Sequence, residues 1–247
     1  MSHPNQTRPD APFRNEPEGT ETLVFDVYGT LVDPISVTET LARELGADTG
    51  VAIARSWRAR QLEYSFRLTV MGQYVDFHHV TRHALIDALA AHEVKDDCPV
   101  EEWCGLYDTL HPFPGTASAL SDLRSAGHRL TVFTNGTKAM VERCLSESGL
   151  LDCFDDVISA DEVKAFKPSP AVYRHASDRT GRPLDELRLV SSNPFDIIGA
   201  HRSGMRTAWI RRTSAPFDSL GAAPDIAVGS LDLLPQALAG ELPGGPA

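Results

Sequence analysis

Apolar residues recur along the chain at two spacings, and each spacing predicts a different kind of element. Short apolar or alternating runs bounded by turn residues predict strands. The predicted strands are Leu23–Phe25, Arg129–Phe133, Asp156–Ser159, Leu187–Val190 and Thr207–Ile210. Apolar residues three or four positions apart predict helices that bury one face. The predicted helices are Pro34–Leu45, Val51–Val70, Phe77–Ala91, Cys98–Leu110, Thr116–Ala126, Lys138–Ser148, Pro168–Arg179 and Phe195–Ser203.

The order of these elements predicts the fold class. After the first strand, only helical patterns occur across residues 34–110. Strands and helices then alternate, which is typical of a parallel sheet that helices cover on both faces. The sequence therefore predicts an α/β fold. Its doubly wound parallel-sheet (Rossmann-like) core takes residues 21–33 and 111–239, and an all-helical cap domain of residues 34–110 is inserted after the first strand.

The two ends of the chain have a different composition. Residues 1–20 combine Pro, Asn and charged side chains with few large apolar ones, so burial would not offset the entropy lost on ordering. We expect a disordered N-terminal tail there. Residues 240–247, with the sequence GELPGGPA, are expected to form a frayed C-terminal tail.

Charge and composition exclude several classes of partner. The net charge is -11, and no cluster of Lys and Arg suits a nucleic acid. No apolar run approaches the roughly 18 residues of a membrane span, and the first residues lack the apolar core of a secretory signal. The four cysteines form no CxxC pair, so neither a zinc site nor a disulfide framework is predicted. We expect a cytoplasmic protein with no nucleic-acid or membrane partner.

Asp26 is the first candidate for chemistry. It follows the apolar run Leu23–Phe25, and Gly29 stops that run, so Asp26 is expected at the carboxyl end of a buried strand. Open α/β sheets bind their ligands at this edge. A carboxylate there is costly to bury without a partner, which leaves two readings: a paired structural acid or a working one.

Polar residues follow the other predicted strands as well. Thr134 and Asn135 come after one strand, the stretch Ser191–Asp196 after another, and Lys167 precedes Pro168. Taken singly, such residues are usually helix N-caps or surface charges. Their order along the chain, with an acid first and a lysine before the last acidic segment, favours one shared site instead.

These segments resemble the four motifs of the haloacid dehalogenase superfamily. The motifs are DVYGT (Asp26–Thr30), FTNGT (Phe133–Thr137), KP (Lys167 and Pro168) and VSSNPFD (Val190–Asp196). Phosphatases of that superfamily carry a second Asp two positions after the first and further acids in the last motif, which hold magnesium. Here the chain has Tyr28 and a single acid in the last motif. The resemblance therefore implies a reaction without metal or other cofactor.

The chain is more similar still to the type II L-2-haloacid dehalogenases. The helical stretch WRARQLEYSF (Trp57–Phe66) and the following MGQYVDF (Met71–Phe77) resemble the signature of their cap. On helical spacing alone, Arg58 would more often be a surface charge that pairs with Glu63 or a neighbour. The resemblance instead implies that Arg58 faces the active site.

The resemblance implies a two-step hydrolysis of short L-2-haloacids to D-2-hydroxyacids and halide. Asp26 would displace the halide and form an ester, and an activated water would hydrolyse that ester. Lys167 would keep Asp26 ionised, Thr30 and Tyr173 would support these two groups, and Asp196 would activate the water. Ser191 and Asn193 would assist Asp196.

Substrate contacts are implied in the same way. A small halogenated carboxylic acid is the expected partner, together with a second copy of the chain in a homodimer. The halide would be held by Arg58, Asn135 and Phe195. The substrate carboxylate would be held by Thr134 and by backbone amides near Val27 and Tyr28, and an apolar pocket would be lined by Leu62 and Phe77.

Two other functions compete with this prediction. One is a phosphatase of the same superfamily, which the missing second Asp disfavours. The other is a catalytically silent binding or dimerisation module, which would be expected to have lost Asp26, Lys167, Asn193 or Asp196, and all of these are present.

Overall fold

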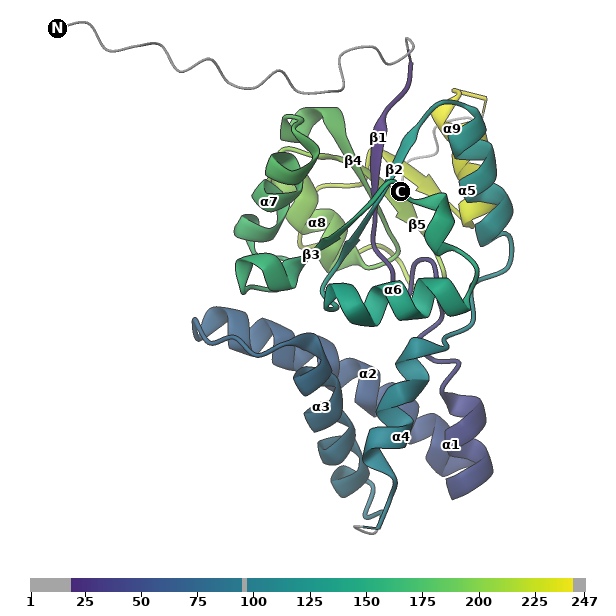
Figure 1. The fold of residues 1–247 in the computed structure, drawn as a ribbon, viewed down its shortest axis with the longest axis vertical. Helices are drawn as coiled ribbons and strands as arrows, with labels where there is room; N and C mark the ends of the chain where they lie inside the picture. The colour runs from purple at the N-terminus through teal and green to yellow at the C-terminus, as the bar shows by residue number, and fades with distance from the viewer. Residues whose placement is uncertain (1–18, 95–96, 242–247) are drawn as a thin grey trace, which may run out of the picture.

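The computed structural model describes residues 19–94 and 97–241, and its centre is a parallel sheet (Figure 1). The six strands have the order β3-β2-β1-β4-β5-β6. Their bounds are β1 Thr22–Phe25, β2 Arg129–Thr134, β3 Asp156–Ser159, β4 Leu187–Ser191, β5 Arg206–Ile210 and β6 Ile226–Val228. The predicted fold class is confirmed.

Strand β1 lies at the point where the strand order reverses. The chain runs outward from β1 through β2 to β3, then crosses back to β4 on the other side of β1. Phe25, the last residue of β1, is in register with Val132 of β2 and Val190 of β4. In open α/β sheets, the carboxyl ends at such a reversal form the ligand crevice.

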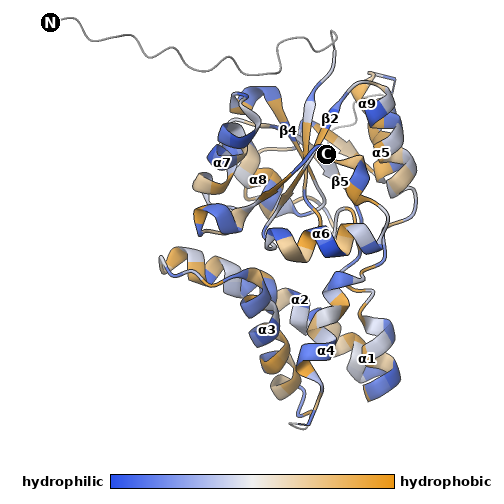
Figure 2. Ribbon diagram, viewed as in Figure 1, coloured by the Kyte–Doolittle hydropathy of each residue, from blue (hydrophilic) through white to orange (hydrophobic). Residues whose placement is uncertain are grey.

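Alternate residues of each strand pack against different helices, because successive side chains of a strand point to opposite faces. Leu23 and Phe25 belong to one core cluster, and Val24 belongs to the other. The first cluster packs under α5 (Thr116–Ser125), α6 (Lys138–Glu147) and α9 (Leu234–Leu238), and the second under α7 (Pro170–Thr180) and α8 (Pro194–Arg202). Figure 2 shows hydrophobic residues concentrated in the central strands and mixed with polar ones along the helices.

Four helices stand apart from the sheet, at the carboxyl ends of its strands (Figure 1). They are α1 (Thr38–Leu45), α2 (Ala47–Val70), α3 (Phe77–Ala91) and α4 (Val100–Gly105). A short 3-10 helix, Leu106–Asp108, follows α4. None of the described residues from 34 to 110 lies in a strand. We call these helices the cap helices; the exact domain boundaries stay a prediction.

The structure corrects several predicted element bounds. The first cap helix begins at Thr38 because the residues from Pro34 to Val37 form turns. Only Gly46 separates α1 from α2, and its φ of 89° breaks the helix in one residue. Strand β6 and helix α9 were not predicted at all. The predicted tails fall mostly on residues 1–18 and 242–247, which lie outside the described part of the chain.

Two neighbouring linkers join the core to the cap helices. The Asp33 amide donates to the His111 carbonyl at 2.8 Å, and the Phe113 amide donates to the Leu31 carbonyl at 3.0 Å. Arg212, just beyond β5, donates to the Thr30 carbonyl at 2.6 Å and lies 4.0 Å from the ring centre of Phe113. The chain therefore leaves and re-enters the core at one place. Across the described residues, no helix has the length and apolar character that a membrane crossing needs.

Candidate active site

Asp26 follows β1 directly, and its two carboxylate oxygens have different surroundings. Oδ2 accepts hydrogen bonds from Thr30 Oγ1 at 2.8 Å and Asn193 Nδ2 at 2.7 Å, with Ser191 Oγ at 3.4 Å. Oδ1 is 3.2 Å from Lys167 Nζ. Because Oδ2 carries most of the donors, Oδ1 is the oxygen with a lone pair free for reaction.

Lys167 lies between two carboxylates and is only 1% exposed. Its Nζ donates to Asp26 Oδ1 at 3.2 Å, to Asp196 Oδ2 at 2.8 Å and to the Phe133 carbonyl at 2.7 Å. An ammonium group has three N–H donors, so these acceptors satisfy it completely. Lys167 thereby supplies the positive charge that two buried acids need.

Asp196, in the first turn of α8, is fully buried behind Lys167. Its Oδ1 accepts a hydrogen bond from the Tyr173 hydroxyl at 2.9 Å. Burial raises the pKa of the Asp196 carboxyl, the Lys167 charge offsets part of that rise, and the negative charge of Asp26 adds to it. Burial, with Asp196 beside it, also raises the pKa of Tyr173 well above its usual value, so Tyr173 remains a hydrogen-bond donor.

A tight turn after Asp26 brings Thr30 back to the carboxylate. Gly29 has a φ of 91°, a conformation that costs glycine nothing and other residues about 1 kcal/mol or more. Thr30 Oγ1 accepts from the Ser192 amide at 2.9 Å while it donates to Asp26 at 2.8 Å. The Ser192 hydroxyl donates to the Gly29 carbonyl at 2.5 Å. The loops after β1 and β4 therefore hold each other and the carboxylate.

Arg58 of α2 reaches the core from the cap helices. Its Nη2 donates to the Tyr28 carbonyl at 3.1 Å, next to the turn that carries Asp26. The alternative pairing with Glu63 is wrong, because Glu63 forms its ion pair with Arg67. Arg58 thus links a cap helix to the loop that carries Asp26, and its part in catalysis stays a prediction.

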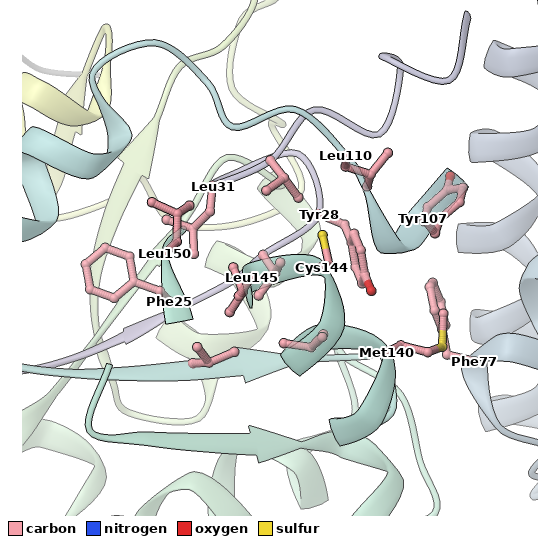
Figure 3. Close-up of a cluster of buried hydrophobic side chains, with 14 of the residues drawn as sticks. Phe25, Tyr28, Leu31, Phe77, Tyr107, Leu110, Met140, Cys144, Leu145 and Leu150 are labelled. Atoms are coloured by element: carbon pink, nitrogen blue, oxygen red, sulfur yellow. The ribbon is translucent and has the colours of Figure 1, made fainter. Parts of the chain in front are cut away.

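Aromatic rings fill the boundary between the core and the cap helices. Tyr28 stacks on Phe77 with 6.0 Å between ring centres and meets Tyr107 edge-on at 5.7 Å (Figure 3). Phe195 meets Phe66 of α2 edge-on at 5.0 Å. Burial raises the pKa of the Tyr28 phenol well above its usual value. At this boundary the chain carries Tyr28, where the phosphatases of the superfamily have a second Asp.

The remaining predicted residues lie around this network with different contacts. Thr134 is fully buried, and its Oγ1 accepts from the Gly136 amide at 3.0 Å. Asn135 Oδ1 accepts from the Lys167 backbone amide at 2.8 Å, which fixes the NH₂ end of the side chain as the free donor. Val27 is fully buried, whereas Leu62 is half-buried on α2. Their contacts with a substrate stay predictions.

The sequence did not point to three groups that the structure connects to this site. The Phe133 carbonyl accepts from Lys167, Arg212 donates to the Thr30 carbonyl, and Gln61 lies next to Arg58. A backbone carbonyl leaves no signal in side-chain identity. Gln61 did leave a signal in the sequence, since it is a polar residue one helical turn from Arg58. It lies on the side of its helix that is buried among the cap helices.

Comparison with known proteins agrees with this geometry. The family model described as haloacid dehalogenase-like hydrolase matches residues 20–204. This chain belongs to that hydrolase family. The (S)-2-haloacid dehalogenase 2 of Pseudomonas sp. strain CBS-3 is 37% identical over 87% of this chain and 94% of the relative. The (S)-2-haloacid dehalogenase 4A of Burkholderia cepacia is 39% identical over 81% of this chain and 86% of its own.

A solved structure has the same fold. The L-2-haloacid dehalogenase from Xanthobacter autotrophicus, with chloropropionic acid covalently bound, superposes with a TM-score of 0.84 at 32% identity. The match covers 90% of this chain and all of the other. The family assignment made from the four sequence motifs is confirmed.

The donor set of this haloacid dehalogenase-like hydrolase does not suit a resident magnesium ion. Magnesium requires several oxygen ligands, usually including carboxylates that are free to bind it. Asp26 and Asp196 both bond to Lys167, and the neighbouring groups are hydroxyls and an amide donor. Among the residues that the structure describes, no three His, Cys, Asp or Glu side chains form a group that could hold a metal ion.

Proposed function

We propose that this hydrolase converts short L-2-haloacids to D-2-hydroxyacids and halide through a covalent ester on Asp26. The observation that carries the proposal is the asymmetry of the Asp26 carboxylate. Oδ1 is next to the Lys167 ammonium, and Oδ2 is held by Thr30 and Asn193. Relatives named as (S)-2-haloacid dehalogenases, at 37% and 39% identity, supply the substrate class.

In the first step, Asp26 Oδ1 attacks the carbon that bears the halogen. A C–O bond forms, the carbon–halogen bond breaks, and the halide leaves with the bonding electron pair. Attack from the side opposite the halide inverts the configuration at carbon. Arg58 and the free amide end of Asn135 are our proposed halide contacts, with Phe195 as an aromatic wall, because donors aimed at the developing charge lower the barrier.

In the second step, water attacks the carboxyl carbon of the Asp26 ester. Oδ2 becomes the ester carbonyl oxygen, and the hydrogen bonds from Thr30 and Asn193 are already aimed at it, so they can stabilise the negative charge that develops there. Asp196 takes a proton from the water, with Ser191 and Asn193 nearby. The bond between the carboxyl carbon and Oδ1 then breaks, the leaving alkoxide takes the proton from Asp196, and the hydroxyacid departs with the Asp26 carboxylate regenerated.

Substrate binding follows from the groups around these atoms. Thr134 and the backbone amides of Val27 and Tyr28 are our proposed contacts for the substrate carboxylate. Leu62 and Phe77 are the proposed lining for the short acyl chain. Asp26 is only 7% exposed and Lys167 1%, so the reaction takes place away from bulk water, where an ion pair and a charged nucleophile interact more strongly.

The test is halide release from each enantiomer of 2-chloropropionate without added metal. We expect release from the L form and formation of D-lactate, because attack opposite the halide inverts the carbon. Release from both enantiomers, or retention of configuration, would contradict direct displacement by Asp26. Hydrolysis of a phosphate ester with no halide release would support the phosphatase alternative.

Metal removal should leave this activity unchanged. Neither Asp26 nor Asp196 is free to bind a cation, because Lys167 occupies both. We therefore expect the same rate of halide release with EDTA, with magnesium and with neither. A loss of activity in EDTA that magnesium restores would show that a cation takes part.

An Asp196→Asn variant should stop after the first step. Asparagine retains the shape but cannot accept a proton from water, so the Asp26 ester should accumulate as one equivalent of added carboxyethyl mass per chain. Intact-protein mass spectrometry after mixing with 2-chloropropionate measures this.

In the natural protein, the single-turnover hydrolysis rate should fall with decreasing pH in a range above 3.8, because burial raises the pKa of Asp196 above that ordinary value and only the ionised form is a base.

We also propose a cytoplasmic location and a homodimer for this enzyme. The location rests on the composition of the chain, and the dimer rests on the resemblance to type II dehalogenases. Size-exclusion chromatography with light scattering would measure the mass in solution, and a monomer would contradict the second proposal.

A further inference from the structure

A buried amide lies directly behind the cap arginine. Gln61 of α2 has no exposed surface, although its neighbours there are large apolar and aromatic side chains such as Trp57 and Tyr107. A buried amide without partners would cost on the order of 1–3 kcal/mol, so its hydrogen bonds have to be made. They connect three segments of the cap helices.

Two hydroxyl groups hold the Gln61 side-chain amide, and the donor-only guanidinium of Arg58 fixes its direction. Its Nε2 donates to Thr81 Oγ1 of α3 at 3.0 Å, and its Oε1 accepts from the Tyr107 hydroxyl at 2.7 Å. Thr81 is fully buried and Tyr107 is 1% exposed, so water does not compete for these bonds. The carbonyl end of Gln61 is therefore held toward Tyr107, and the NH₂ end is held away from it.

The same carbonyl oxygen faces the guanidinium of Arg58. Arg58 Nη1 lies 3.5 Å from Gln61 Oε1, and Arg58 Nη2 lies 3.1 Å from the Tyr28 carbonyl. Two acceptors, one from the cap helices and one from the core, thus hold two corners of a rigid planar group. Reversing the Gln61 amide would turn N–H donors toward the guanidinium, which is itself only a donor.

We infer that Gln61 is a positioning residue that aims Arg58 at the departing halide. This inference rests on the proposed function, in which Arg58 stabilises that halide. Gln61 does not touch the substrate; it acts through Arg58, and Thr81 and Tyr107 hold it in place. A purely structural role would instead make Gln61 a clamp among α2, α3 and the 3-10 helix Leu106–Asp108, with no effect on the leaving group.

These two roles predict different dependence on the halogen. Chloride is a poorer leaving group than bromide, so its departure depends more on donors aimed at the developing charge. If Gln61 aims Arg58, its loss should slow the chloride substrate more than the bromide substrate. If Gln61 is only a clamp, both substrates should lose activity equally.

The experiment compares Gln61→Met, Thr81→Val and a control, Ser65→Ala. Methionine matches glutamine in length but has no amide, and valine removes only the acceptor that holds Gln61 in place. Ser65 is also buried on α2, but its hydroxyl donates to the Leu62 carbonyl at 2.7 Å and not to Gln61. For each protein, kcat/KM is measured with L-2-chloropropionate and L-2-bromopropionate, and chloride and bromide affinities are measured by calorimetry without substrate.

We expect Gln61→Met to lose about tenfold in kcat/KM with the chloride substrate, the scale of one hydrogen bond to a charged group, and less with the bromide substrate. Halide affinity should fall in parallel. Thr81→Val should change both quantities in the same direction by a smaller factor, and Ser65→Ala should match the natural protein.

Equal losses for both substrates with unchanged halide affinity would overturn the inference and leave the clamp role. Unchanged kinetics and affinity in both network variants would overturn it as well. If the natural protein released no halide from either substrate, the proposed function would fail. The calorimetry would then test the inference separately, since it needs no turnover. Equal halide affinities of the natural protein and the Gln61→Met variant, or no halide binding by the natural protein, would reject the inference.

Discussion

An Asp26→Asn variant is expected to release no measurable halide, with a rate more than about 10⁴-fold below that of the natural protein, as is typical when a covalent nucleophile is removed. Asparagine fits the same space, and its single oxygen can accept from Lys167 on one side or from Thr30 and Asn193 on the other, because its NH₂ group is only a donor. It lacks the anionic oxygen that attacks carbon. Near-identical circular dichroism spectra would show that the variant still folds, so that the loss reflects chemistry.

Oxygen isotope transfer tests the same residue in the natural protein. In a single turnover in ¹⁸O-labelled water, with enzyme in excess over substrate, the label should enter the Asp26 carboxylate and not the hydroxyacid. Asp122→Asn, an exposed change on α5, is the matched control and should keep full activity. Label found mainly in the product would mean that water attacks the substrate directly and would reject the ester.

A Lys167→Met variant should lose both activity and stability. Methionine has a similar length but no charge, so Asp26 and Asp196 would be left as two buried acids without a cation. Breaking such an ion pair costs about 3–5 kcal/mol of folding free energy, unless one acid retains a proton. Halide release should fall at least about 10³-fold at neutral pH, because the ammonium group that holds the attacking oxygen of Asp26 is gone.

The dependence on pH separates this explanation from a simple packing defect. Without Lys167, Asp196 loses the positive charge that offsets the rise of its pKa, so the stability deficit of the variant should shrink as the pH falls and this buried acid becomes neutral. Urea unfolding of both proteins at several pH values measures this. A deficit that stays constant with pH would mean that the lost methylene and ammonium packing matters more than the charge.

The sequence predicted the sheet well where strands are long and apolar. Strands β1 to β5 each follow a distinct apolar run, and their alternation with helices indicated a parallel sheet. Strand β6 was not predicted because its three residues, Ile226–Val228, are too few to show an alternating or apolar pattern. Helix α9 has only five residues and includes Pro235, so its pattern is equally weak.

In the candidate site, residues inside short sequence motifs could be predicted, whereas contacts between residues far apart along the chain could not. Asp26, Lys167 and Asp196 were predictable because each stands at a strand end or before a proline, inside a motif. Gln61 left only a local signal, a polar residue one helical turn from Arg58, and its partners could not be predicted because they lie 20 and 46 residues away along the chain. Nor could periodicity show that Arg212 donates to Thr30, a residue 182 positions earlier.

The paired linkers between the core and the cap helices have a consequence for how this enzyme could be rebuilt. Because residues 31–33 and 111–113 hydrogen-bond to each other, the inserted helices begin and end at neighbouring points of the core. An insertion with adjacent ends can be exchanged as a module, since the host needs no change in its own path. Cap helices from another enzyme of this architecture could be grafted between these linkers. The graft would change the residues that face the substrate from the cap side and leave Asp26, Lys167 and Asp196 unchanged. Diversification of the substrate range could then proceed by recombination rather than by successive substitutions around the nucleophile.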